Sequence, residues 1–400
     1  MKNLMPDTAS SLPHAATLDR QGRYIYIACP WTPVGGGMFK VADYLIQSQA
    51  TNTPAHAAEL RSLDTRGGGS AAASMWVLLK AIGKLFRGRL SGRLAGVHVN
   101  MAERLSLVRK SGIVVACTAL GIPVVLHLHA AQLHHFYRSL PRPAQRLTRW
   151  VFSLPDSVIV LGDAARRFVT EELHVPPRRV EIVINGVPEP ATAHARRPAT
   201  RVRRVLFLGN LSERKGVSDL LHALAQPGFD AATVEVVIAG GGDIASYETK
   251  ARSLGLADNV RFAGWCDQSQ VAVLMSHADV LVLPSYDEGL PLVILEALAH
   301  GVAVVCTPVG EIPSVLTHGV DAYFVQAGDI DGIADGLRHV LHRPELLETL
   351  GRNGRVLYEQ QFSLAQFFAS IARIHQRHFG VAGQLAQPAD SAAGAPGETA

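Results

Sequence analysis

The sequence is poor in cysteine and has no apolar run long enough to cross a membrane. Its four cysteines, Cys29, Cys117, Cys266 and Cys306, are far apart, show no CxxC spacing and lie in apolar runs. This pattern predicts reduced core thiols rather than a disulfide framework. The richest apolar run, residues 113–126, is too short and too interrupted to span a bilayer, and no long apolar stretch begins the chain. We therefore expect a cytoplasmic protein.

Motifs for metal and nucleic-acid binding are missing as well. The sequence has no HExxH motif, and we expect neither a metal ion nor a cofactor in its site. No aromatic platform or recognised nucleic-acid motif accompanies the basic residues, which argues against DNA or RNA as a partner.

Length and charge indicate two domains. A chain of 400 residues with 48% hydrophobic content can bury substantial cores, and this length favours two domains over one. The net charge of +4 hides an asymmetry, because residues 1–200 contain 24 Lys and Arg and 12 Asp and Glu, whereas residues 201–400 contain 14 and 22. A basic first half and an acidic second half suggest domains with different partners.

Much of the basic excess lies in two stretches without acidic residues, 80–94 and 134–152. In the second stretch arginines recur every three to four residues, and on one helix they would form a basic stripe beside Leu and Trp. Two interpretations stay open: docking on an anionic membrane surface, at the inner face of the cell membrane, and a solvated helix face. The first would involve Lys84, Arg87, Arg89, Arg93, Arg138, Arg142, Arg146 and Arg149.

Short apolar runs rich in β-branched residues alternate with helical patterns in both halves. They do not alternate with polar residues, which is typical of parallel strands covered by helices on both faces. The runs are residues 24–30, 97–100, 124–130 and 157–162, then 204–210, 234–242, 260–265, 279–285 and 302–308. The sequence therefore predicts an α/β protein with two doubly wound, Rossmann-like domains.

Composition also predicts the boundaries between the parts. A segment of Pro, Ala and Thr without apolar periodicity separates the halves, and the end of the chain cannot support a core. The expected parts are a flexible extension (1–23), a first domain (24–192), a linker (193–203), a second domain (204–361), an amphipathic helix with a possible return to the first domain (362–380) and a disordered tail (381–400).

Two glycine-rich turns follow predicted strands and precede predicted helices, where backbone N–H groups favour anions. The first contains three successive glycines, 35–37, and is either a phosphate or ligand site or an ordinary turn; its spacing is not that of a dinucleotide-binding motif. The second, at 207–225, sets Arg214 and Lys215 directly before a helix. Cations there oppose the helix dipole, so either a bound polyphosphate explains them or they are a solvated pair.

Residues 284–301, PSYDEGLPLVILEALAHG, place two glutamates eight positions apart. A helix beginning near Leu290, with Pro291 in its first turn, leaves Glu288 in the preceding loop and sets Glu296 more than one turn along the helix. The first carboxylate can accept hydrogen bonds from sugar hydroxyls, or it can simply cap the helix. We expect the two acids to serve different parts of one ligand.

These segments together resemble glycosyltransferase family 4, whose members are retaining enzymes of the GT-B fold. The stretch from Glu288 to Glu296 looks like the family's E-x7-E motif, and FLGN, ERKG, FAGW and DVLVLPS follow the family's order and separations over residues 204–360. In the first half the resemblance depends on the GGG turn and VVLHLHA, while HVNMAERLSLVRKSG is similar to members that build bacterial exopolysaccharides. The resemblance implies two Rossmann-like domains that face each other across a cleft.

Carried over position by position, the resemblance implies roles for residues of both domains. Lys215 and Arg214 would neutralise the donor diphosphate. Glu288 would contact the transferred sugar, and Glu296 would bind the nucleotide ribose. The other implied donor contacts are Gly36 and Gly37 near the diphosphate, Gly264 and Trp265 near the base, and the backbone of Gly289, Leu290 and Pro291 under the sugar and phosphate.

Three positions need separate comment. The resemblance sets His129 beside the transferred sugar, but His127 lies on the same strand face, so either histidine can face the cleft. Family members commonly have arginine after the glycine of the FLG turn; this chain has Asn210, which we keep among the donor contacts. Near residue 310 the family's usual paired glycine and later glutamate are replaced by Glu311 and Ser314.

The resemblance implies transfer of a hexose from a nucleotide-diphospho-sugar, the co-substrate, to a saccharide acceptor with retention of anomeric configuration, in cell-surface polysaccharide or glycoconjugate synthesis. The acceptor is expected to be lipid-linked if the basic stretches bind a membrane. The donor would bind the acidic domain and the acceptor the basic one, and domain closure would exclude water. The alternatives are a nucleotide-sugar epimerase or a phosphorylase on the same fold, and a non-catalytic binding subunit, which Asn210 alone favours.

Overall fold

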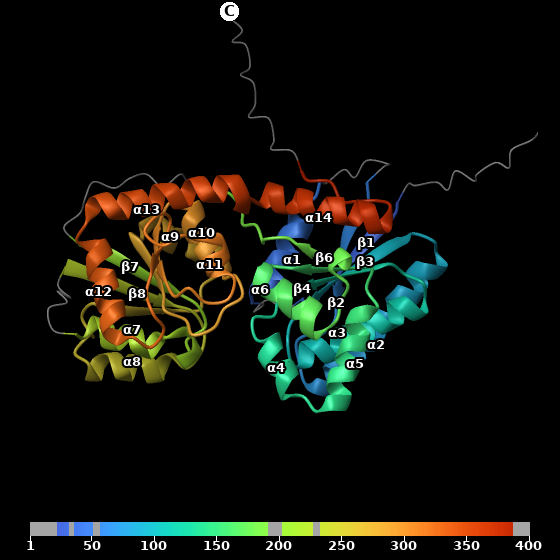
Figure 1. Ribbon diagram of the computed structural model, residues 1–400, viewed down its shortest axis with the longest axis horizontal. Helices are drawn as coiled ribbons and strands as arrows, with labels where there is room; N and C mark the ends of the chain where they lie inside the picture. Colours follow the sequence, from blue (N-terminus) through green and yellow to red (C-terminus); the bar gives the residue numbers. More distant parts are fainter. Residues whose placement is uncertain (1–21, 32–35, 51–56, 191–201, 227–232, 387–400) are drawn as a thin grey trace, which may run out of the picture.

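The computed structural model describes residues 22–31, 36–50, 57–190, 202–226 and 233–386. These residues form two α/β domains side by side, each with a six-stranded parallel sheet (Figure 1). The described part of the chain contains no helix with the length and apolarity needed to cross a membrane.

The N-terminal domain contains one sheet and the helices that cover it. Its strands are β1 (Tyr24–Cys29), β2 (Glu59–Asp64), β3 (Leu94–Met101), β4 (Val124–Leu128), β5 (Ser157–Val160) and β6 (Val180–Ile182). Its helices are α1 (Gly37–Gln47), α2 (Ala71–Leu90), α3 (Leu105–Ala119), α4 (Leu133–Ser139), α5 (Arg142–Ser153), α6 (Asp163–Arg167), η1 (Phe168–Glu172) and η2 (Pro177–Arg179).

The C-terminal domain repeats this plan. Its strands are β7 (Arg203–Leu208), β8 (Val234–Ala239), β9 (Val260–Gly264), β10 (Val280–Leu283), β11 (Ala303–Cys306) and β12 (Tyr323–Phe324). The helices that follow β7 are η3 (Glu213–Lys215), α7 (Val217–Leu224), α8 (Ile244–Ser253), α9 (Gln268–His277), α10 (Leu292–Ala299), α11 (Ile312–Val315), α12 (Ile330–Leu341), α13 (Pro344–Leu357), η5 (Tyr358–Phe362) and α14 (Leu364–Phe379).

Each sheet reverses its strand order once. The first sheet runs β2-β1-β3-β4-β5-β6, so the chain changes direction between β1 and β3; the second runs β12-β11-β10-β7-β8-β9 and changes direction between β10 and β7. In open parallel sheets the connections diverge at such a point, and this leaves a crevice at the carboxyl ends of the two strands. The fold therefore provides one ligand-binding position in each domain.

The predicted strands are all present, and the strands that the sequence did not predict are β2, β6 and β12. All three lie at sheet edges. Interior strands are buried on both faces and read as continuous apolar runs, whereas an edge strand keeps one side in contact with water. In β2 the buried Leu60 and Leu63 are separated by Arg61 and Ser62, so the segment carries no apolar run that could reveal it.

Successive residues of the N-terminal strands contribute to two different hydrophobic clusters, one on each face of the sheet. In β1, Ile25 and Ile27 belong to the cluster that includes α1 and α14, while Tyr24 and Ala28 belong to the cluster that includes α2 and α3. The cysteines form no disulfide. Burial raises the pKa of the Cys29 thiol to about 12, so this thiol remains protonated and packs as a core residue.

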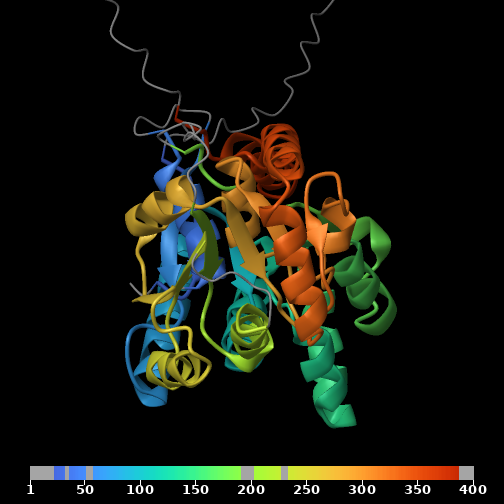
Figure 2. The same ribbon diagram turned by 90° about the vertical axis from the view of Figure 1, so that its left-hand side faces the viewer.

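The last helices connect the two domains. In both views α13 and α14 lie along the upper edge of the molecule (Figure 1, Figure 2). Helix α14 returns to the N-terminal sheet, where the aromatic ring of Phe379 packs on β3 over Gly96; a Cβ at Gly96 would lie 2.3 Å from Phe379 Cδ1. At the crossing the backbone N–H of Val187 donates to Phe362 O at 3.0 Å, and the N–H of Leu364 donates to Val187 O at 3.0 Å.

Three expectations about local structure are wrong. The tail expected to be disordered from residue 381 is ordered through 386: Val381 is 2% exposed, and the N–H of Ala58 donates to Ala382 O at 2.8 Å. Helix α10 begins at Leu292, two residues later than expected, because Pro291 has an extended ψ of 124° and serves as its N-cap. Residues 1–21 of the predicted extension (1–23), residue 35 of the glycine turn, residues 193–201 of the predicted linker (193–203) and the tail from 387 lie outside the described residues.

The third wrong expectation is that the arginines of residues 134–152 form one basic stripe on a single helix. Arg138 lies on α4, while Arg142, Arg146 and Arg149 lie on α5, because extended backbone at Leu140 and Pro141 separates the two helices. Arg138 forms an ion pair with Glu172 at 2.6 Å. The N–H of Arg149 Nε donates to Glu172 O at 2.9 Å, so both arginines are held by η1.

Three buried histidines join α14 to the N-terminal sheet. His98 Nδ1 lies 2.9 Å from His375 Nε2, and His98 Nε2 lies 3.2 Å from His127 Nδ1. Their exposed fractions are 0, 1 and 0%. Burial lowers the pKa of His98 to about 3 and holds the pKa values of His127 and His375 well below the usual 6.5, so all three are neutral at pH 7.

We expect the free energy of unfolding to fall as the pH drops below about 6.5. Below this pH the histidines of the unfolded chain bind protons, whereas the buried histidines of the folded chain stay neutral. Their contribution to the free energy of unfolding is therefore fully present above pH 6.5 and is lost progressively below it. Each of the three should contribute a loss of about 1 kcal/mol between pH 6.5 and 5.5. Urea denaturation at these two pH values measures the loss of unfolding free energy. In His375→Phe this loss should be smaller by about 1 kcal/mol, the contribution of one histidine. The exposed His277→Asn is the control; an unchanged pH dependence in His375→Phe would contradict the assignment.

Candidate active site between the two domains

The loops that follow β7 and β10 meet at the carboxyl end of the C-terminal sheet. These strands are neighbours, with Val280 paired to Val205 and Leu281 paired to Leu206. Because the chain changes direction between them, the crevice of this domain lies here. Lys215 comes from the first loop and Glu288 from the second, so the topology alone brings the two segments together.

Local backbone geometry places Lys215 at the floor of the crevice. The short helix η3 ends at Gly216, whose φ of +68° turns the chain into α7. A Cβ at Gly216 would lie 2.1 Å from Pro284 O, so only glycine allows the two loops to approach. The turn buries Lys215, which is 9% exposed, and leaves Arg214 at the surface.

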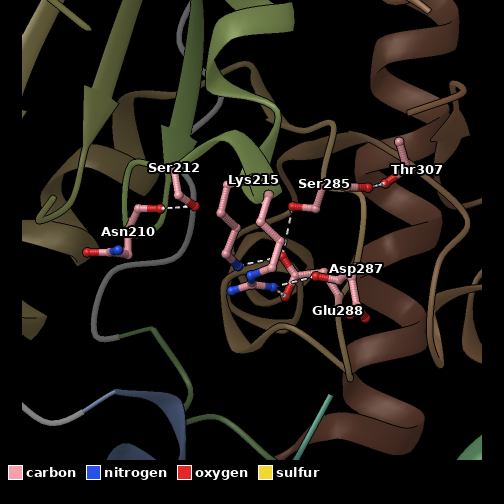
Figure 3. A network of polar contacts seen from close by, with 8 residues as sticks. Asn210, Ser212, Lys215, Ser285, Asp287, Glu288 and Thr307 are labelled. Atoms are coloured by element: carbon pink, nitrogen blue, oxygen red, sulfur yellow. Dashed lines mark hydrogen bonds and ion pairs between the residues drawn. The ribbon is translucent and has the colours of Figure 1, made fainter. Parts of the chain in front are cut away.

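Glu288 is the centre of a polar network (Figure 3). Its Oε1 accepts hydrogen bonds from Lys215 Nζ and, at 2.8 Å, from Ser285 Oγ. Thr307 Oγ1 donates to Ser285 O at 2.5 Å and fixes this loop to β11. Arg214 Nη1 donates to Asp287 O at 2.5 Å and lies 4.0 Å from Glu288 Oε2. Two cations thus surround a carboxylate that is 6% exposed.

A second loop supports Glu288 from behind. Gly310 has a φ of +61°, and a Cβ there would lie 1.9 Å from Glu288 O. The N–H of Glu311 donates to Gly289 O at 3.0 Å. Gly289 in turn lies against the N-terminal domain: a Cβ built at this glycine would be 3.9 Å from Ala131 Cα. The loop carrying Glu288 is therefore held between α11 and the opposite domain.

The Glu311 side chain crosses the cleft and contacts the N-terminal domain. Its Oε1 accepts from Ala165 N at 2.7 Å and its Oε2 from Ala164 N at 3.2 Å, in the first turn of α6. Glu311 is 3% exposed. A glycine at this position would leave those N–H groups without the carboxylate, so Glu311 supplies a contact between the domains.

Glu296 makes a further contact between the domains. Lys40 Nζ of α1 lies 3.1 Å from Glu296 Oε1, and Tyr44 OH donates to the same oxygen at 3.4 Å. The start of α1 also approaches α10, with the Cβ position of Gly37 3.6 Å from Leu292 Cδ1. Burial and the charge of Glu296 raise the pKa of the Tyr44 hydroxyl above its usual range, so the tyrosine stays protonated as a donor.

A cavity of about 530 Å³ lies between the domains, next to Glu288. Its C-terminal wall consists of residues 286–289, after β10, and residues 309–311, after β11. Its N-terminal wall combines the end of β4 with α4, α6 and η1. The polar and charged side chains that line it are His134, His135, Arg138, Arg167, Glu171, Glu172, Tyr286, Asp287, Glu288 and Glu311. A space of this size and polarity suits a small polar ligand.

The structure distinguishes the two histidines of β4. His127 is buried within the strand, whereas His129 follows its last residue and keeps partial exposure. His129 Nε2 lies 2.8 Å from Oδ1 of Asn100, and the backbone N–H of His129 donates to Met101 O at 2.8 Å. Burial and the nearby His98 lower the pKa of His129 to about 3. At neutral pH its imidazole is uncharged and can act as a hydrogen-bonding group.

Other predicted residues lie apart from this centre. Asn210 is exposed, and its side chain points away from the Lys215–Glu288 pair (Figure 3). Gly264 is the last residue of β9, two strands from β7, and Trp265 follows it with 54% exposure. Gly36 is the N-cap of α1 on the opposite domain. Leu290 and Pro291 continue the Glu288 loop into α10.

Sequence reasoning missed several polar partners in the site. These are Lys40, Asn100 and Ser285, together with the role of Glu311. Ser285 stands three residues before Glu288, and this spacing is the only local signal. The other three meet their partners across the cleft or between strands. Among the described residues no group of three or more His, Cys, Asp and Glu side chains could hold a metal ion.

We expect Lys215→Met and Glu288→Gln each to lower the free energy of unfolding by about 3 to 5 kcal/mol, because each leaves a buried charge without its partner. The double variant should be more stable than either single variant. Urea denaturation measures all three, and Asp335→Asn, which removes the exposed pair with Arg338, should cost less than about 1 kcal/mol. Additive losses in the double variant would show that the two charges are not coupled.

We also expect Glu311→Ala to separate the domains in solution. The variant removes two charge-assisted hydrogen bonds, and this should shift the balance between closed and open forms at least about tenfold. Small-angle X-ray scattering measures the shift as a larger radius of gyration. Ser314→Ala removes the hydrogen bond to Glu311 O at 2.7 Å and a 3.5 Å contact with Glu311 Oε2, but it keeps both hydrogen bonds from α6. This variant should leave the radius unchanged, and an equal radius in Glu311→Ala would refute the contact's role.

Comparison with known families agrees with this architecture. Residues 193–357 match the family Glycosyl transferases group 1, and residues 56–189 match Glycosyltransferase Family 4. The chain is similar to N-acetyl-alpha-D-glucosaminyl L-malate synthase of Bacillus anthracis, with 29% identity over 216 residues, which are 52% of this chain and 56% of that protein. The match thus spans less than two thirds of that relative.

Solved structures share the fold. Sucrose-phosphate synthase from Thermosynechococcus elongatus superposes with a TM-score of 0.71 and 19% identity, covering 90% of this chain and 99% of that one. HepE from Anabaena, in complex with UDP, gives a TM-score of 0.69 and 15% identity, covering 89% and 100%. Since the two family matches together span more than half of the sequence, the chain belongs to the family 4, group 1 glycosyltransferases and has the GT-B fold.

Proposed function

We propose that this glycosyltransferase moves a hexose from a nucleotide-diphospho-sugar to a lipid-linked saccharide, with retention of anomeric configuration, in the synthesis of a cell-surface polysaccharide or glycoconjugate. The observation that carries the proposal is the convergence of Lys215, Arg214 and Glu288 at the strand-order reversal of the C-terminal sheet, facing the other domain. Cations and a carboxylate so placed suit a ligand that joins a diphosphate to a polyol.

The donor diphosphate would bind between the cationic turn and α10. Arg214 is exposed, and both Arg214 and the buried Lys215 approach the carboxylate of Glu288. The free N–H groups at the start of α10 supply further donors for a phosphate. HepE, whose fold is similar, was solved with UDP, which supports a nucleoside diphosphate as the leaving group. Glu296 and Lys40 would lie at the ribose, because α10 carries this glutamate one turn further on.

The transferred sugar would lie beside Glu288. Once the diphosphate attracts Lys215, the carboxylate can accept hydrogen bonds from sugar hydroxyls while Ser285 continues to hold it. His129 would contact the sugar from the opposite domain as a neutral imidazole, because its pKa is about 3. The cavity of about 530 Å³ provides room for the acceptor on the N-terminal side.

Bond cleavage would place charge on groups that this site can stabilise. As the C–O bond lengthens, the sugar gains positive charge and the leaving phosphate gains negative charge. Lys215, Arg214 and the N–H groups of α10 would stabilise the phosphate, and we propose that they do so without a metal ion. Loss of one preorganised contact of this kind costs about 3 to 4 kcal/mol in the transition state. The contacts of Glu311 and Glu296 across the cleft would keep water from the donor.

Lys215→Ala and Glu288→Ala should each lower sugar transfer at least about a hundredfold, because each removes a contact that strengthens as charge develops. A thermal-shift screen of nucleoside diphosphates and their sugars first identifies the donor. Release of the nucleoside diphosphate then measures turnover, with circular dichroism to confirm folding. Lys250→Ala, a lysine that donates to Ser218 Oγ at 2.7 Å, is the matched control. Turnover close to wild type in both site variants would refute the assignment.

The same assay separates the alternatives. An epimerase would change the sugar of the donor with no acceptor present, and a phosphorylase would require inorganic phosphate. Nuclear magnetic resonance of the first product reports retention or inversion at the anomeric carbon. Full activity in excess EDTA would support the metal-free assignment, and loss of activity that added metal restores would overturn it.

A further inference from the structure

Helix α2 has an outer face that is rich in large apolar side chains. Met75, Trp76, Leu79, Phe86 and Leu90 are between 51 and 72% exposed. Single exposed apolar residues are common, but a contiguous group of five on one helix marks an interaction site. We call these five residues the apolar ridge.

The ridge has a regular geometry. At about 100° per residue its members fall within an arc of roughly 100° on α2. Lys80, Lys84 and Arg87 fall along one border of the arc, and Arg89 falls along the other. Trp76 is in contact with this border, since Lys80 Nζ lies 5.5 Å from its ring centroid. The 20 residues of the helix contain no acidic side chain.

Neighbouring helices extend the surface. Helix α3 packs against α2 and exposes Leu105 (68%) and Val108 (65%); α5, which contacts α3, exposes Leu147 (59%) and Trp150 (48%). Neither helix carries an acidic residue. Nine of the large exposed apolar side chains in the described part of the chain therefore lie on three adjacent helices of one domain. Figure 1 shows α2 on the side of the N-terminal domain away from the C-terminal domain.

We propose that the apolar ridge inserts into the interface of an anionic lipid bilayer, with the basic border at the level of the headgroups. A helix that lies in the membrane plane buries an apolar face, keeps cations beside it and gains from both contacts. Charge complementarity favours this occupant, because a face with several cations and no carboxylate suits a negatively charged surface. Arg138 and Arg149, which Glu172 holds, contribute less than the α2 residues.

The orientation would serve transfer at a membrane. Helix α2 begins after β2, at the carboxyl end of the N-terminal sheet, and this end faces the cleft. Insertion of α2 would therefore hold the N-terminal domain, which forms one wall of the cleft, at the lipid surface. This inference deepens the lipid-linked acceptor of the proposed function and rests on it. Vesicle binding requires no sugar transfer, so the two proposals can fail separately.

Co-sedimentation of the full chain with lipid vesicles tests the proposal. We expect binding to vesicles of phosphatidylcholine with phosphatidylglycerol, and weak binding to phosphatidylcholine alone. Leu79→Ser with Phe86→Ser should lower the partition coefficient at least about thirtyfold, since both side chains leave water on insertion. Lys84→Gln with Arg87→Gln should lower it by a similar factor at about 0.1 M salt and by much less at about 0.5 M, where screening has weakened the charges.

Matched controls make the outcome specific. Val320→Ser with Val356→Ser, exposed by 47 and 45% on the C-terminal domain, should bind vesicles as wild type does. Lipids brominated on the acyl chains should quench fluorescence in wild type and less so in Trp76→Phe, which keeps the apolar ring. Circular dichroism confirms that each variant folds.

Two results would overturn the proposal. One is equal vesicle binding by wild type and the Leu79→Ser, Phe86→Ser variant, which would leave surface charge as the only contact. The other is no vesicle binding by wild type together with a dimer in sedimentation velocity that the same variant abolishes, which would make the ridge an interface between two copies of this chain.

Discussion

A lysine and a glutamate buried beside each other, Lys215 and Glu288, hold together two loops that leave neighbouring strands of one sheet. Removing two charges from water costs several kcal/mol for each ion, so the pair is tolerated only because its geometry is close and Ser285 gives the carboxylate a further donor. Glycines make that geometry accessible: Gly216 lets one loop approach Pro284, and Gly310 lets α11 approach the other from behind. The site is thus preorganised before any ligand binds.

The position of this pair follows from topology. The strands within each sheet are parallel, so the loops after the strands gather at the carboxyl end of the sheet. Where the strand order reverses, the loops diverge and leave a crevice at that end. The two ends face each other, and contacts such as Glu311 with α6 and Glu296 with Lys40 close the space between them. Domain contact and site geometry therefore depend on the same loops. A hinge motion that separates the domains would change the shape of the site without altering the Lys215–Glu288 pair.

The C-terminal helix adds a second constraint, which acts on the N-terminal domain. Helix α14 crosses from the C-terminal domain and buries His375 against His98 and His127 of the opposite sheet. These neutral imidazoles pair with one another where charged groups would be too costly. His129, the histidine next to the cleft, lies at the end of the same strand as His127 and contacts Asn100 of β3. The buried histidines that hold α14 therefore lie next to the residues that position His129.

The sequence by itself determined the fold class, every interior strand of the two sheets and the segments that form the site, because buried parallel strands and strand-to-helix turns have patterns that short stretches of chain reveal. It did not reveal β2, β6 and β12, since edge strands keep polar residues. Only the tertiary structure decided that Glu311 reaches α6, that His129 rather than His127 stays partly exposed, and that Pro141 splits the predicted basic stripe between two helices. Such contacts join residues far apart in the chain, and no local pattern encodes the distance between them.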